Sequence, residues 1–426
     1  MSFFVSVQAM LKNQFGHATR ALYSRNYRLF FSGQGVTLTG NWMQRLALAW
    51  LVMRLGGSAA DLGIMSALTQ MPTILLGPLA GVVADRYEKR ALLRIIQLLA
   101  VIQAFGLAFL TLAEWITLWQ LFALALFMGC INAFEMTIRQ SFVVEMVDDK
   151  QDLPNAVALN SVLFNSARAI GPALGGQFVR FFGEGLCFLL NGFSYAASNF
   201  ALRAMQLPEF KRTAGGRRNI AQEFLAGFQY IRQTPSIGYS LMIVAAVSTL
   251  GLQQMILLPV LTRDFLGGGS ELLGNLMLAF GLGAVLTAAF VATRHGTGGL
   301  TGVVFLGCLF TGISQLVMLQ SSGTAWVFFM VALNGYGAIA AVVVSNTIIQ
   351  LLVAPEMRGR VASFYSLSLM GIGPLGGYLS GLLTDWQGIG VTMTALGIGS
   401  LAAAGLYRVM AGPAISSQLN KLSQVS

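Results

Sequence analysis

Charged residues are scarce in this chain of 426 residues. Asp, Glu, Lys and Arg make up 10% of it, whereas soluble globular domains carry about 25%. Hydrophobic residues make up 55%, and the mean hydropathy is +0.70. This shortage of charge excludes a soluble globular protein and predicts an all-α polytopic membrane protein.

The side chains that build metal, disulfide and phosphate sites are also few. The three cysteines, Cys130, Cys187 and Cys308, fall in separate apolar stretches, and the two histidines lie in polar segments. No lysine stands in a G-x-x-x-x-G-K-[ST] setting, and the G-x-G-x-x-G match at 371–376 lies inside an apolar run. We therefore expect no metal, no cofactor and no enzymatic activity.

Apolar runs of roughly twenty residues, long enough for a helix to cross a membrane, repeat along the chain. They predict twelve spans, near 29–53, 62–84, 91–113, 116–138, 155–181, 185–207, 236–261, 271–293, 299–320, 324–350, 361–383 and 388–410. The longest polar stretch separates six spans from six. The expected organisation is two pseudo-symmetric six-helix bundles, 1–207 and 236–426, joined by a linker at 208–235. No small-residue cleavage site stands out near the first run, so we expect no cleaved signal peptide.

The net charge of +10 is distributed unevenly around these spans. With the N-terminus in the cytoplasm, 21 of the 26 Lys and Arg residues fall in cytoplasmic tails and loops. Three of the others, Arg54, Arg180 and Arg263, lie on the opposite side, and two lie inside spans. Because such a bias sets the orientation of polytopic proteins, it predicts cytoplasmic termini rather than a nucleic-acid partner.

The linker has two parts. The first, EFKRTAGGRRN, is predicted to be a flexible connection. In the second, Ile220, Phe224, Phe228 and Ile231 share one helical face. This spacing predicts a short amphipathic helix along the cytoplasmic surface of the membrane.

A short motif recurs in the two halves, as GPALGG at 171–176 and GPLGG at 373–377. Proline removes a backbone hydrogen bond and kinks a helix, and glycine lets a neighbouring helix approach closely. The repetition predicts a bend and a close contact where the two halves meet; the alternative is tight packing alone. The residues concerned are Gly171, Pro172, Gly175, Gly176, Gly373, Pro374, Gly376 and Gly377.

The loop GVVADRYEKR, at 81–90, places Asp85 at the end of the second span. A carboxylate there faces the negative end of its own helix dipole, so we expect it to serve another partner. That partner is either the positive start of another helix or a cation. The candidate cations are Arg86, Lys89, Arg90, Arg358 and Arg360. The alternative is an ordinary charged turn.

This loop resembles the cytoplasmic signature of the major facilitator superfamily at Gly81, Asp85, Arg86 and Arg90, whereas Glu88 departs from it. GPALGG resembles the span-5 motif of the exporting, proton-antiporting branches. The stretches 25–52, 137–161 and 357–366 are similar to the subgroup that contains the enterobactin exporter and macrolide efflux proteins.

The resemblance implies a monomeric transporter in the bacterial cytoplasmic (inner) membrane. It would export a small or medium-sized amphiphilic molecule, such as a drug or a siderophore, by alternating access in exchange for protons. Two alternatives remain open: a translocator of lipids or lysolipids, and a transporter-like receptor that moves no substrate.

The first span departs from the subgroup at Asn41, where an aspartate is common. Asn cannot titrate, so a proton carrier is missing there. Arg45 follows one turn later; a central arginine costs about 2.5–3.5 kcal/mol on insertion scales, so it should face the bundle interior or a watery cavity. In the fourth span, Glu135 and Arg139 are four residues apart and can pair. We expect Glu135 either to carry protons or only to neutralise Arg139.

In this superfamily, spans 1, 4, 7 and 10 line the central cavity. Carried over by position, the polar lining and coupling residues would be Gln34, Asn41, Gln44, Arg45, Asn132, Glu135, Arg139, Gln253, Gln254, Asn334, Tyr336 and Asn346.

Overall fold

The computed structural model describes residues 20–146, 150–206, 220–294, 296, 298–321 and 323–423. Every regular element in these ranges is a helix. The expectations for the N-terminal tail and for the first part of the linker concern residues outside these ranges.

The N-terminal half begins with a short 3₁₀ turn, η1 (Arg20–Tyr23). Its helices are α2 (Arg25–Arg54), α3 (Ala59–Arg86), α4 (Lys89–Leu112), α5 (Leu118–Met146) and, after a 3₁₀ turn η2 (Lys150–Asp152), α6 (Leu153–Ala204). Inside α6 the backbone leaves helical geometry at Gly183, where φ is 77° and ψ is 169°. Glycine adopts positive φ at little cost, so this residue divides α6 into two limbs.

The linker helix α7 (Ile220–Gln233) leads into the C-terminal half. Its elements are α8 (Pro235–Ala246), η3 (Val247–Gly251), α9 (Gln253–Val260), η4 (Leu261–Phe265), α10 (Ser270–Ala292), α11 (Leu300–Val317), η5 (Met318–Gln320), α12 (Thr324–Leu352), η6 (Pro355–Met357), α13 (Arg358–Ser366), η7 (Leu367–Gly371), α14 (Gly373–Leu406), η8 (Tyr407–Ala411) and α15 (Gly412–Ser423). Gly388, with φ 85° and ψ 164°, divides α14 as Gly183 divides α6.

Nine of the helical segments in the described residues are long and apolar enough to cross a membrane. Two of them contain the glycine breaks at Gly183 and Gly388. Together with the composition, they identify a multi-pass membrane protein. The twelve predicted ranges all overlap helices of the structure.

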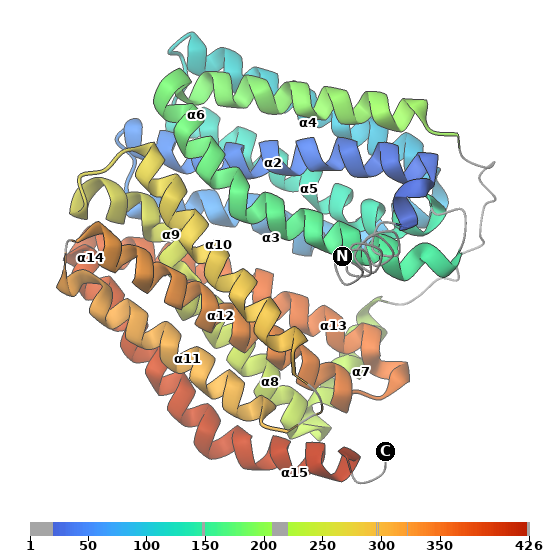
Figure 1. Cartoon of the computed structure of the whole chain (residues 1–426), viewed down its shortest axis with the longest axis vertical. Helices are drawn as coiled ribbons and strands as arrows, with labels where there is room; N and C mark the ends of the chain where they lie inside the picture. The colour runs from blue at the N-terminus through green and yellow to red at the C-terminus, as the bar shows by residue number, and fades with distance from the viewer. Residues whose placement is uncertain are drawn as a thin grey trace, which may run out of the picture.

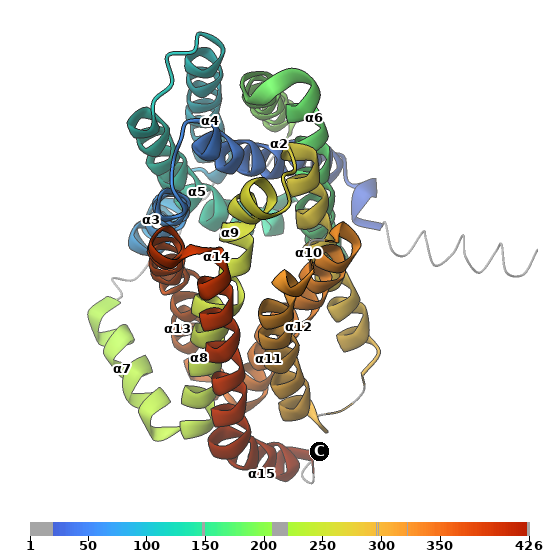
Figure 2. The same ribbon diagram turned by 90° about the vertical axis from the view of Figure 1, so that its left-hand side faces the viewer.

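The two halves lie side by side, and their helices run from one end of the molecule to the other (Figures 1 and 2). We call the end that carries α7 and the α3–α4 turn at Tyr87 the linker side. The opposite end, with the breaks at Gly183 and Gly388, is the far side. At the far side α6 packs on α10 and α3 packs on α14, so helices of one half contact helices of the other.

The apolar cores follow the same division. One core spans both halves at the far side, where Leu46 and Leu62 of the N-terminal half pack in the same cluster as Leu257 and Leu273 of the C-terminal half. Toward the linker side each half has a core of its own. One surrounds Tyr27 and the other Val304. The halves are therefore joined at the far side and separate toward the linker side.

The linker helix α7 packs on α13. The ring of Phe224 stacks on that of Phe364, with 4.6 Å between their centroids, and the backbone N–H of Ala354 donates to the Tyr230 hydroxyl at 3.1 Å. Half of Phe224 and half of Phe228 nevertheless stay exposed. Part of the apolar face of α7 is thus in contact with α13, and its place along a membrane surface stays a prediction.

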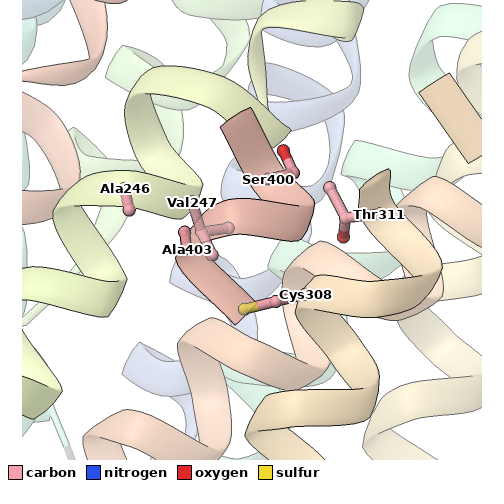
Figure 3. Close-up of a pocket in the computed structure, with 6 residues that line it drawn as sticks. All are labelled: Ala246, Val247, Cys308, Thr311, Ser400 and Ala403. Carbon is pink, nitrogen blue, oxygen red and sulfur yellow. The ribbon is translucent and has the colours of Figure 1, made fainter. Parts of the chain in front are cut away.

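The C-terminal half contains π-helical turns that free backbone carbonyls. The Gln315 amide donates to the carbonyl of Leu250, in η3, at 2.8 Å, and Ser400 donates to the other end of Gln315 at 3.1 Å. A small gap lies beside this cluster, between Val247, Cys308 and Ala403 (Figure 3). It has no volume open to a water-sized molecule, so it is a packing defect and not a binding site.

Candidate functional site

A cavity of about 620 Å³ lies between the two halves. From the N-terminal half it is lined by α2, α3, α5 and the first limb of α6. From the C-terminal half it is lined by the segment 248–256, by α10 and α12, and by the junction of η7 with α14. This volume is within the range of small-molecule sites, about 300–1,000 Å³.

The two walls of the cavity differ in charge. All charged lining residues of the described chain come from the N-terminal half: Arg45, Glu135, Arg139 and Arg168. Three arginines and one glutamate leave a formal excess of two positive charges. The opposite wall is uncharged and mostly apolar, with Met255, Ile256, Met277, Phe280, Val342 and Met370 among its residues.

Glu135 and Arg139 lie on one face of α5 and form a pair. The Glu135 carboxylate is 3.6 Å from the Arg139 guanidinium, which also donates a 3.1 Å hydrogen bond to the side-chain oxygen of Gln34. Glu135 is only 4% exposed, and its Oε1 has no hydrogen-bond partner in the structure. The carboxylate is thus buried next to one cation, and the oxygen nearest that cation accepts no hydrogen bond.

The other two arginines stack on aromatic rings. The Arg45 guanidinium carbon lies 4.8 Å from the ring centre of Trp42, and that of Arg168 lies 6.0 Å from the ring centre of Phe280, in the opposite half. Neither forms a salt bridge with a carboxylate of the described residues. Both lie on the wall that the N-terminal half contributes.

Asn41 lines the cavity one turn before Arg45, and its side-chain oxygen accepts a 2.7 Å hydrogen bond from the Tyr195 hydroxyl. Tyr195 lies in the second limb of α6 and is fully buried. Asn41 is therefore fixed to the body of its own half.

The far side of the cavity is closed by polar contacts between the halves. The Asp385 carboxylate, in α14, accepts hydrogen bonds from the backbone N–H groups of Ala59 and Ala60 at 2.8 and 2.9 Å. These N–H groups have no acceptor within α3, because they lie in its first turn. The start of a helix is positive, so an anion is stabilised there. Arg263 also donates to the carbonyl of Met53 at 2.9 Å.

At the linker side, the corresponding contacts are missing from the described residues. Asp85, Arg86 and Arg358 are exposed, and Asp85 forms no hydrogen bond or ion pair there. Arg90 binds within its own half, donating to the carbonyls of Leu202 and Arg203 at the end of α6, at 2.9 and 2.8 Å. The expected contact of Asp85 with the start of another helix or with a cation is therefore absent from this conformation and stays a prediction for another one.

Residues 20–424 match the family described as transmembrane secretion effectors, within the major facilitator superfamily. The chain belongs to this family. It is therefore a membrane transporter, and the resemblance to the superfamily is confirmed.

Three curated relatives have transport functions. The chain is 25% identical to the staphyloferrin A transporter of Staphylococcus aureus (88% of this chain, 93% of the relative) and 26% identical to the multidrug efflux pump Tap of Mycolicibacterium fortuitum (84% and 89%). It is 23% identical to the enterobactin exporter EntS of Shigella boydii (89% and 89%). Among solved structures, the nucleoside transporter NupG aligns with a TM-score of 0.69 at 16% identity (91% and 98%), which shows a shared fold.

The structure brings together about half of the lining residues expected for this transporter. Asn41, Arg45, Asn132, Glu135, Arg139 and Gln253 line the cavity, whereas Gln34, Gln44, Gln254, Asn334, Tyr336 and Asn346 do not. Most of the second group face the interior of their own half. Gln44 accepts from Asn191 at 2.7 Å, and Asn334 donates to Ser314 at 3.3 Å.

Several polar lining residues were not expected. They are Thr69, Gln70 and Thr73 on α3, Asn165 and Arg168 on α6, and Ser248. In α3 and α6 these residues recur three or four positions apart inside apolar spans. A polar face of helical period is therefore the pattern that identifies them in the sequence.

The repeated glycine motifs of the transporter lie at close helix contacts. A Cβ on Gly175 would lie 2.9 Å from the Met43 backbone in α2, and one on Gly176 would strike the Ser270 carbonyl of α10, in the other half. In the second motif, a Cβ on Gly376 would lie 2.6 Å from the carbonyl of Thr249 in η3. Pro172 lies inside a helical stretch, and the backbone of α6 departs from helical geometry at Gly183 instead.

Proposed function

We propose that this transporter exports a small or medium-sized amphiphilic molecule by alternating access, in exchange for protons. The observation that carries the proposal is a cavity between two halves, one wall charged and the other apolar, closed at one end by contacts between the halves. The siderophore and drug transporters among its relatives support this class of substrate.

For the topology, we infer twelve crossings. The nine membrane-length segments support this number once α6 and α14 are divided at Gly183 and Gly388 and the 30-residue α2 is added. Six crossings belong to 1–207 and six to 236–426. The positive-inside rule assigns both termini and the linker side to the cytoplasm of a bacterial inner membrane.

In this topology the structure represents an inward-facing state. To reach the outward-facing state, the contacts of Asp385 with α3 would break and the linker side would close. Asp85 would then accept hydrogen bonds from the start of α13, near Arg358 and Arg360, just as Asp385 does from the start of α3. Each half would thus contribute one carboxylate that caps a helix of the other half in one of the two states.

Glu135 is the proposed proton carrier. It lines the cavity, it is buried, and the oxygen that faces Arg139 accepts no hydrogen bond, so a proton added to the carboxylate would create a donor near cavity water. The Arg139 guanidinium favours the ionised form of the Glu135 carboxylate. Protonation would break this pair, so binding of the proton is linked to the local arrangement of α5.

Proton flux in proteoliposomes tests the proposal. The purified protein is reconstituted with the pH dye pyranine in the lumen, and staphyloferrin A, enterobactin or a macrolide is added outside. Antiport moves protons out as the compound enters, so the lumen becomes alkaline with at least one of them. Entry of a labelled lysolipid without this response would support the lipid translocator. Binding without entry of any compound would support the receptor.

A further inference from the structure

The arginines of the cavity are not equivalent. Arg139 has Glu135 and Gln34 as partners, whereas Arg45 and Arg168 face the cavity without a carboxylate among the described residues. An arginine in a membrane protein normally pairs with an anion or a backbone carbonyl. The positive charge that remains is therefore open to a ligand.

The geometry of these two arginines suits an anion. Each guanidinium is held over an aromatic ring, Arg45 over Trp42 and Arg168 over Phe280. Stacking uses the flat face of the guanidinium and leaves its N–H edge available, and this edge matches the oxygens of carboxylate and sulfonate groups. Because both guanidinium groups line the same wall, one anion bound there is attracted by two positive charges.

The opposite wall requires the rest of the ligand to be apolar. Met255, Met277 and Met370 come from three different segments of the C-terminal half and face the same space as Ile256. Methionine side chains are flexible and polarisable, so such a wall adapts to apolar groups of varied shape. A small inorganic anion would leave this wall in contact with water only.

On the basis of the proposed function, we propose that the substrate is an anionic amphiphile. Its carboxylate or sulfonate group lies between Arg45 and Arg168, and its apolar part lies against the methionine-rich wall. Glu135 is neutralised by Arg139 and does not compete with the ligand anion. A cationic amphiphile of the same shape would meet two unpaired arginines and is excluded by charge.

A matched pair of ligands tests this charge selection. We suggest 8-anilinonaphthalene-1-sulfonate and its neutral primary sulfonamide, which share the same rings. Binding to the purified full-length protein in non-ionic detergent is measured by equilibrium dialysis against protein-free micelles. The sulfonate should bind at least about tenfold more tightly, the effect of one charged hydrogen bond.

Substitutions then assign the selectivity to the two residues. Arg45→Gln and Arg168→Gln should each weaken sulfonate binding about tenfold and leave sulfonamide binding within about twofold, which also shows that the fold is intact. Arg45→Lys keeps the charge and should retain part of the affinity. Arg408→Gln is the control, because Arg408 also stacks on an aromatic ring, Phe305, but does not line the cavity.

The outcomes are separable from those of the flux experiment. Equal affinities for the two ligands, no binding of either, or sulfonate affinity that both glutamine variants leave unchanged would overturn the proposal. Arginine-dependent sulfonate binding in a protein that shows no flux would leave the anion site standing and remove the antiport. Flux with a neutral or cationic compound alone would keep the transporter and reject the anionic substrate.

Discussion

The hydrogen bonds from α3 to Asp385 provide the sharpest test of how the two halves move. Asp385→Asn removes the negative charge at the start of α3 and keeps one acceptor oxygen. Asp385 is exposed, so water screens it and the lower part of the range for charge–helix interactions applies. We expect a loss of about 0.5 kcal/mol from the far-side-closed state, which moves the balance of the two states about twofold toward far-side opening.

Spin-label distances measure this shift. Cys130, Cys187 and Cys308 are replaced by serine, and labels are attached at Gln120→Cys and Ser321→Cys, which are exposed at the far side on opposite halves. The population with the longer distance should rise in Asp385→Asn. Asp85→Asn should act in the opposite direction, because it removes the proposed contact of the other state and no contact of this one.

Asp61→Asn is the matched control for the same helix. Asp61 belongs to the capping box of α3, where it accepts from the N–H of Ser58 at 2.8 Å inside one half. This substitution should lower thermal stability without moving the distance distribution. The two-carboxylate account of the gates would be refuted if Asp385→Asn left the wild-type distance distribution unchanged. It would also be refuted if Asp85→Asn shifted the distribution in the same direction as Asp385→Asn.

Three further substitutions test other parts of the mechanism. Gly176→Leu should still insert but should abolish transport, because its side chain would strike α10 of the other half. The control Gly106→Leu has open space around it and should transport normally. Normal export by the Gly176→Leu variant in vesicles would contradict the close contact. Gly175→Leu, which faces α2 of its own half, should mainly lower thermal stability, and an unchanged melting temperature would argue against tight packing there. Glu135→Gln should retain downhill exchange of substrate but lose uphill export driven by a pH gradient. Substrate accumulation driven by the pH gradient at the wild-type level would remove Glu135 from the coupling.

The positions of the helices could be predicted from the sequence, but the faces that they present to the cavity could only partly be predicted. Span length follows from the thickness of the bilayer, so the apolar runs and the polar linker marked the helices. Gln253 and Gln254 are neighbours on a helix that is apolar all round, and only Gln253 lines the cavity. No periodicity distinguishes two such residues, and the π-turns at η3 and η4 shift the rotation of that span.

The far-side contact could not be predicted from residue types. Asp385 accepts from the backbone of Ala59 and Ala60, and backbone donors have no sequence signature. Arg168 was recognisable as a charge inside a span, but its position over Phe280 depends on how α6 and α10 pack. Such information comes from the tertiary arrangement of the two halves.

The glycine contacts between the two halves imply an abrupt transition between the two states of the transporter. Gly63 of α3 faces the backbone of Gly377 in α14, with 2.7 Å from its hypothetical Cβ to the carbonyl oxygen, and Gly274 of α10 faces the carbonyl of Pro172 at 2.6 Å. Dispersion attraction between such surfaces has a very short range, and a gap of about 0.5–1 Å already removes a quarter to a half of it. A separation of about 1 Å between the two halves would therefore remove up to half of this attraction before any new contact forms. The contacts between the halves should therefore be either fully formed or fully broken, and the protein should spend little time between its two end states.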